Sequence, residues 1–144
     1  MVTIEEDYVS FEIAKLLKEK GFNERLLTFY ITDEAKKEGC FQLMAFTDDK
    51  IDNNHSDHCY LAPTLQMAMK WLREVHGVTI VIDTNDIWLG EDNRFYWCKI
   101  YYNMGDRIEI KWYNDPSKPN DILRYQTYEE ASEEAIKYCL KNLI

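Results

Sequence analysis

The chain has 144 residues, of which 46% are hydrophobic and 30% charged, with only 5 Gly and 3 Pro. This composition is typical of a globular protein and excludes a fibrous or disordered chain, and the length predicts a single domain over residues 1–144. The 26 acidic residues outnumber the 17 basic ones and give a net charge of −9. Because binding to a polyanion depends on clustered Lys and Arg, this balance argues against direct contact with nucleic acid or an anionic membrane.

The cysteine pattern and the N-terminus predict a cellular compartment. The four cysteines, Cys40, Cys59, Cys98 and Cys139, are far apart and form no C-x-x-C pair, so they predict neither a zinc site nor a redox dithiol. The N-terminus is acidic rather than basic, and no run of about 18 apolar residues is present to span a bilayer. We therefore expect a cytoplasmic protein with reduced thiols and no contact with a membrane.

The first half of the chain predicts a helix and two strands before a polar loop. Ser10 is a good N-cap and Gly21 a good helix terminator, which predicts a helix ending at Lys20. Alternating apolar residues predict strands at Leu26–Ile31 and Phe41–Phe46. The Asp- and Asn-rich segment Thr47–Ser56 favours turns over burial, so we expect a loop there.

The second half predicts a helix, three strands and a final helix. Apolar residues at three- and four-residue steps predict a helix from Pro63 to His76, and Thr127 with Glu130 forms a capping box that starts the last helix. Two prolines favour a loop in the segment between the last strand and this helix. The three strands are predicted at Val78–Asp83, Arg94–Asn103 and Arg107–Tyr113, and the loop at Asn114–Asp121.

The predicted order is helix, strand, strand, helix, three strands, helix. This order predicts an α+β fold: a mostly antiparallel sheet of about five strands with the helices packed on one face, which would bury every apolar stripe.

The strand at 94–103 is the most informative segment, because aromatic residues occupy both of its faces. By period-two alternation, Tyr96, Cys98 and Ile100 share one face, and we expect them in the core together with Ile108, Ile110 and Trp112 of the next strand. The opposite face then carries aromatic residues beside Lys99 and Lys111. Such a cluster predicts either a surface for a protein partner or self-association, or a face covered by the N-terminal helix or the first two strands. The predicted protein-binding residues are Phe95, Trp97, Tyr101 and Tyr113.

The sequence offers little support for an enzyme. It contains no glycine-rich phosphate loop, no nucleophile elbow and no zinc-protease motif, and it predicts no cofactor. The one weak candidate for a metal or cysteine site is His55, His58 and Cys59, whose spacing permits shared ligation. A solvated loop with two exposed imidazoles explains the same residues without a metal.

Three segments carry a resemblance to other proteins. The runs S-F-E-I-A-K-L-L-K-E-K-G-F, Y-L-A-P-T-L-Q-M-A-M-K-W-L-R-E and T-Y-E-E-A, in this order, resemble a group of small proteins without known activity from gut Bacteroidetes genomes, often in phage or mobile-element settings. The resemblance implies a bacterial or phage origin and transfers no active site. The leading hypothesis is a non-enzymatic binding module. The alternatives are an acidic decoy of a DNA-binding host protein, and a metal or cysteine enzyme.

Overall fold

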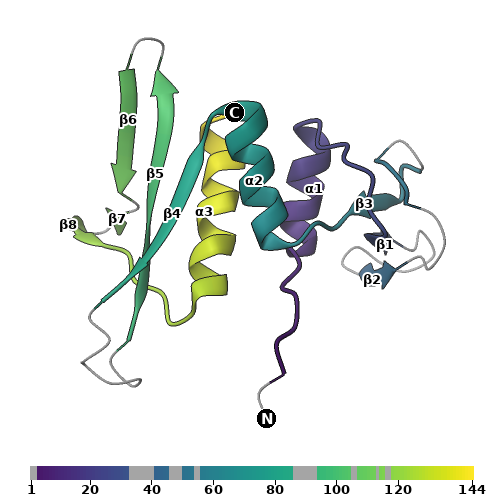
Figure 1. Ribbon diagram of the computed structural model, residues 1–144, viewed down its shortest axis with the longest axis horizontal. Helices are drawn as coiled ribbons and strands as arrows, with labels where there is room; N and C mark the ends of the chain where they lie inside the picture. Colours follow the sequence, from purple (N-terminus) through teal and green to yellow (C-terminus); the bar gives the residue numbers. More distant parts are fainter. Residues whose placement is uncertain are drawn as a thin grey trace. The chain divides into compact units, whose positions relative to one another are not determined.

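The computed structural model describes residues 3–32, 41–45, 50–53, 56–85, 94–104, 107–112, 114–115 and 118–144. The chain divides into two compact units, residues 1–68 and 69–144, and each is described by itself. Helices and strands are mixed along the chain, which confirms the α+β class (Figure 1). The expectation of a single domain stays a prediction.

The described part of the first unit contains a helix and an antiparallel sheet, before helix α2 (Leu65–His76) begins. Helix α1 (Phe11–Glu19) is followed by strands β1 (Thr28–Thr32), β2 (Phe41–Ala45) and β3 (Cys59–Leu61), in the sheet order β2-β1-β3. Strands β1 and β2 confirm the two predicted strands. Strand β3 was not predicted, because three residues are too few to show an alternating pattern.

Local sequence signals explain helix α1. The Ser10 hydroxyl accepts a hydrogen bond from the Ile13 backbone N–H, and Gly21 has the positive φ of 85° that a glycine adopts most easily after a helix. The buried side of α1 contacts β3. Two T-shaped ring contacts of Phe11, with Tyr30 and Tyr60, fix the helix on the sheet.

The segment expected as a purely polar loop contains two buried residues. Ile51 exchanges two backbone hydrogen bonds with Leu26, and the Asn53 side chain is 7% exposed. The Asn53 amide donates to the Phe22 carbonyl and accepts from the Leu61 N–H at 3.0 Å. An asparagine can be buried when both ends of its amide are satisfied, so the expectation of no burial in Thr47–Ser56 is wrong at these residues.

Helix α2 (Leu65–His76) spans the boundary between the two units. Its first turn is capped by Thr64, whose hydroxyl accepts a hydrogen bond from the Met67 N–H at 3.2 Å. Gly77, with φ of 67°, follows the helix. The helix predicted from Pro63 to His76 is therefore confirmed. Among the described residues, no helix is long and apolar enough to cross a membrane.

The second unit contains a second antiparallel sheet and a hairpin. Strands β4 (Thr79–Thr84), β5 (Tyr96–Met104) and β6 (Arg107–Trp112) form a sheet in the order β4-β5-β6. Strands β7 (Asn114–Asp115) and β8 (Lys118–Ile122) pair with each other. The loop expected at Asn114–Asp121 is therefore wrong in part. Pro119 is compatible with β8 because a two-stranded hairpin leaves backbone positions that need no N–H donor.

The expected sheet of about five strands is also wrong. The strands divide between two three-stranded sheets and the β7–β8 hairpin. Strand β3 pairs with β1, with Tyr60 opposite Tyr30, and completes the first sheet before the chain reaches β4. The alternation of a strand reveals which face is apolar but not which strand lies beside it, so the sequence could not separate one sheet from two.

Helix α3 (Tyr128–Asn142) packs against β4 and β5 (Figure 1). The Thr127 hydroxyl accepts a hydrogen bond from the Glu130 N–H at 3.1 Å, which confirms the predicted helix start. The inner side of α3 is fully buried and is met by Cys98 and Ile100 of β5, both 0% exposed. The buried residues of α3 are Ala131, Ser132, Ala135, Ile136, Cys139 and Leu140.

Candidate functional site

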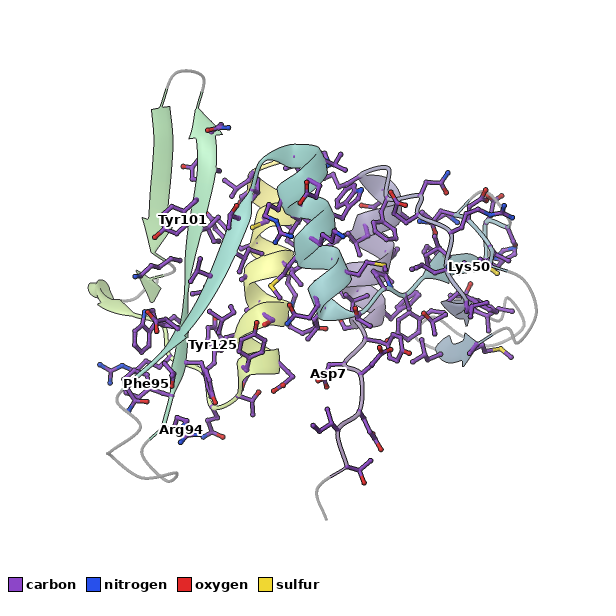
Figure 2. The ribbon with its side chains drawn as sticks, viewed as in Figure 1. Asp7, Lys50, Arg94, Phe95, Tyr101 and Tyr125 are labelled. Carbon is purple, nitrogen blue, oxygen red and sulfur yellow. The ribbon has the colours of Figure 1, made fainter. Side chains whose placement is uncertain are left out.

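Strand β5 has one face in the core and one face away from helix α3. Because Cys98 and Ile100 are buried against α3, period-two alternation directs Trp97, Lys99 and Tyr101 to the other side. In Figure 2, Tyr101 lies on the side of β5 away from α3. We call this side the outer face and define it by Phe95, Trp97, Lys99 and Tyr101, with Val81 and Asp83 of β4.

The aromatic side chains of the outer face are half-buried. The side chains of Phe95, Trp97 and Tyr101 are each partly accessible to solvent, and Val81 is 38% exposed. The rings are therefore neither sealed in the core nor fully solvated. Three of the four predicted binding residues share this face. The fourth, Tyr113, lies outside the described residues.

An ion pair crosses the outer face from β5 to β4. Strand pairing places Asp83 opposite Trp97 and Val81 opposite Lys99, so Lys99 and Asp83 are diagonal neighbours. The Lys99 Nζ lies 3.9 Å from the Asp83 carboxylate. Since both side chains retain solvent contact, the pair contributes little to stability, about 0–1 kcal/mol. Its main effect is to place one charge of each sign among the rings.

The observed pairing of β6 with β5 differs from the pairing that the predicted core face required. We expected Ile108, Ile110 and Trp112 beside Cys98 and Ile100, but the backbone pairs Ile110 with Tyr101 and Trp112 with Lys99. The expected neighbour of Lys99, Lys111, is paired with Ile100 instead.

The cause of this correction is the short connection between the two strands. Met104 pairs with Arg107, so only two residues separate them, and in such a hairpin odd-numbered residues of one strand pair with even-numbered residues of the other. The backbone register therefore pairs even-numbered residues of β6 with odd-numbered residues of β5.

Phe95 is fixed at the end of the outer face by hydrogen bonds to its backbone. Its N–H donates to the Asn85 side-chain oxygen at 2.9 Å, and its carbonyl accepts from the Thr84 hydroxyl at 2.9 Å. The Phe95 ring lies 5.6 Å from the Trp97 ring, measured between centroids. The two rings therefore form a continuous aromatic surface held by the end of β4.

Arg124 joins this aromatic surface from a distant part of the sequence. Tyr125 forms an antiparallel bridge with Tyr96, which brings the residues before α3 alongside the start of β5. The Arg124 guanidinium carbon lies 4.7 Å from the centroid of the Phe95 ring, in a cation–π contact. No local pattern in the sequence indicates this pairing, so sequence reasoning missed Arg124.

Two buried N–H donors at this end of β5 have no acceptor. Trp97 Nε1 and Arg94 Nε are both inaccessible to solvent, and neither has a hydrogen-bond partner among the residues that the structure describes. An unsatisfied buried donor costs about 1–3 kcal/mol. Such groups are rare in folded proteins, and each therefore needs an explanation.

The weak metal or cysteine candidate is only partly described. Cys59 is buried and His58 is exposed, while His55 lies outside the described residues. Burial raises the pKa of the Cys59 thiol, and the nearby Lys18 ammonium only partly opposes this shift. A raised pKa disfavours the thiolate that a metal ligand or nucleophile requires. Within the described residues, no group of three His, Cys, Asp or Glu side chains could hold a metal ion.

The Lys18 side chain has a structural role at the same place. Its ammonium donates to the carbonyls of Ser56 and Cys59 at 2.9 and 2.8 Å and lies over the Tyr60 ring at 4.7 Å. These contacts explain why a half-buried cation lies beside Cys59 without giving it a role in catalysis or metal binding. Lys18 of α1 is thus tied to the start of β3 at Cys59 and Tyr60.

Comparisons of the chain with protein-family models, with curated proteins and with solved structures found no match. The resemblance to the Bacteroidetes group and the cytoplasmic location accordingly remain predictions.

Proposed function

We propose that the protein is a non-enzymatic binding module that uses the outer face to hold a protein partner. The observation that carries this proposal is the difference between the two faces of β5. One face packs against α3, and the other has a row of half-buried aromatic rings around the Lys99–Asp83 ion pair. Tyr and Trp dominate binding energy at protein interfaces because they bring a large contact area at a low cost in side-chain entropy.

The charge pattern of the outer face favours a protein over a polyanion. Its described charges are Lys99, Asp83 and Arg124, a mixture of signs, in a chain with a net charge of −9. Stacking of nucleotide bases would use the same rings but needs a basic groove along the backbone of the nucleic acid. Mixed charges around aromatic anchors are typical of protein interfaces.

Selection from a displayed random-peptide library tests the proposal without a known partner. Selected peptides should bind the wild-type protein, and Tyr101→Ala should weaken them about tenfold or more, as expected for an aromatic anchor. The matched control is Tyr102→Ala. Tyr102 is the next residue on the same strand, is also half-buried, and lies on the opposite face.

The proposal requires that the two substitutions differ. Equal loss of affinity in both variants would mean that peptide binding reports on the stability of the protein rather than on the outer face. If Tyr101→Ala has no effect, the peptides bind elsewhere. Thermal unfolding of both variants measures their stability independently. Sedimentation of the wild-type protein and the Tyr101→Ala variant tests self-association. If the wild-type protein self-associates and the variant does not, the partner is a second copy of the chain.

A further inference from the structure

We infer that Arg124, held against Phe95, is the receptor for a carboxylate on an acidic segment of the partner. This inference rests on the proposed function and names the chemistry of the partner at one end of the outer face. It starts from the contact between the Arg124 guanidinium and the Phe95 ring at 4.7 Å.

The contact with Phe95 does not itself use the N–H donors of Arg124. A guanidinium has five N–H donors, and an aromatic ring engages its charge without supplying a carboxylate or carbonyl acceptor. Among the residues that the structure describes, no carboxylate forms an ion pair with Arg124, whereas Lys99 is paired with Asp83. Arg124 is also exposed. Its donors are therefore accessible to an incoming group.

Backbone hydrogen bonds hold the two segments that bring Arg124 and Phe95 together. Tyr125 is hydrogen bonded to Tyr96 through both backbone groups at 2.8 Å, and the Phe95 backbone is held by Asn85 and Thr84. An arginine that is oriented in advance loses less side-chain entropy on binding, so each hydrogen bond contributes more to affinity. The paired N–H donors of a planar guanidinium match the two oxygens of a carboxylate.

The surroundings favour an isolated carboxylate next to an apolar side chain. The Phe95 and Trp97 rings, 5.6 Å apart, continue the surface from Arg124 along β5. One exposed arginine on an acidic protein suits a single Asp or Glu and not a polyanion, which needs several cations in a row. We therefore expect a partner segment with an acidic residue close to an aromatic or aliphatic one.

The experiment selects displayed random peptides on the wild-type protein and on Arg124→Gln. Peptides from the wild-type selection should be enriched in Asp or Glu beside an apolar residue, and this enrichment should vanish on Arg124→Gln. Arg124→Gln should lower the affinity for a selected peptide about tenfold, and Glu→Gln or Asp→Asn in the peptide should do the same. Combining the change in the protein with the change in the peptide should lower the affinity little more than either change alone. Arg124→Lys should bind weakly because it lacks the planar fork. The charge-matched control is Arg73→Gln, an exposed arginine of α2 that pairs with Glu74.

The outcomes separate this inference from the proposed function. Peptides that depend on Tyr101 but show no acidic enrichment and ignore Arg124→Gln would overturn the carboxylate receptor and leave the binding module intact. Peptides that ignore both Tyr101 and Arg124 would overturn both. Binding of a 12-nucleotide single-stranded DNA that depends on Arg124 at physiological salt would replace the carboxylate by a phosphate and also overturn the inference.

Discussion

Tyr96 and Tyr125 exchange two backbone hydrogen bonds, each 2.8 Å long, although they are far apart in the sequence. Among the described residues, β6 pairs with β5 as far as Lys99, and Tyr125 lies beside β5 further along, opposite Tyr96. The chain leaves the sheet after Trp112, forms the β7–β8 hairpin and returns at Tyr125. This return places Arg124 over Phe95, and so the candidate site depends on a single bridge.

Amide hydrogen exchange measures the stability of this bridge. The amides of Tyr96 and Tyr125 should exchange on the order of 100-fold more slowly than the amide of Gln126, because opening them requires local unfolding of the sheet edge. Gln126 is exposed and follows Tyr125 directly, so it reports on the same segment without the bridge. Equal exchange of Tyr125 and Gln126, observed by nuclear magnetic resonance, would show that Arg124 is not held in place.

Trp97→Phe tests the unsatisfied indole donor on the outer face. The substitution removes the buried Nε1 donor that has no described partner, and this gain offsets part of the lost ring area. The free energy of unfolding should therefore change by less than about 1 kcal/mol. Trp71→Phe, at a buried tryptophan of α2, should cost about 1–2 kcal/mol in the same denaturant titration. A larger loss for Trp97→Phe than for Trp71→Phe would indicate that the Trp97 indole is a core group.

The buried asparagine of the first unit should be critical for stability. Asn53→Ala leaves the Phe22 carbonyl and the Leu61 N–H without their partner, so the expected loss is about 2–4 kcal/mol in the free energy of unfolding. Asn23→Ala is the comparison, because Asn23 is exposed and contributes one hydrogen bond, to the Asn53 N–H at 2.8 Å. It should cost about 1 kcal/mol. Similar losses for both variants would contradict the central role of Asn53.

The buried thiols of the second unit predict a loss of stability at alkaline pH. Burial raises the pKa of Cys98 to about 11 and that of Cys139 to about 12. An unfolded thiol ionises at about pH 8.5, so above that pH the unfolded chain releases protons that the folded chain retains. The free energy of unfolding should fall as the pH rises from about 8.5 towards 11.

The control for this prediction is a double variant, Cys98→Ala with Cys139→Ala, measured by denaturant titration across the same pH range. Every other residue is the same in both proteins, so the difference in slope reports on the thiols. The variant should lose stability less steeply than the wild-type protein. Identical slopes would mean that the two thiols are accessible to water in the folded state.

Signals within a few residues were sufficient to predict the helices. Ser10 and Thr127 cap the helices whose starts they predicted, Thr64 caps α2, and Gly21 and Gly77 follow two of the helix ends. Alternation likewise identified β1, β2, β4, β5 and β6. These elements depend on local backbone preferences and on one apolar face, both of which are visible in a short window.

Pairing between distant segments could not be predicted in this way. The division into two sheets depends on β3, and the register of β6 against β5 depends on a two-residue connection whose length the alternation does not reveal. The same holds for the candidate site. The outer-face rings Phe95, Trp97 and Tyr101 follow from the period of one strand, whereas the contact of Arg124 depends on a bridge to Tyr125 that no short window contains.

A photo-crosslinking comparison tests the role of the outer face most directly. Benzoylphenylalanine is placed at position 101 in one protein and at position 102 in another, and each is irradiated with a selected peptide. Because neighbouring residues of a strand point to opposite faces, we expect a crosslink from position 101 and none from position 102. A crosslink from position 102 alone, or equal yields from both, would contradict a partner bound on the outer face.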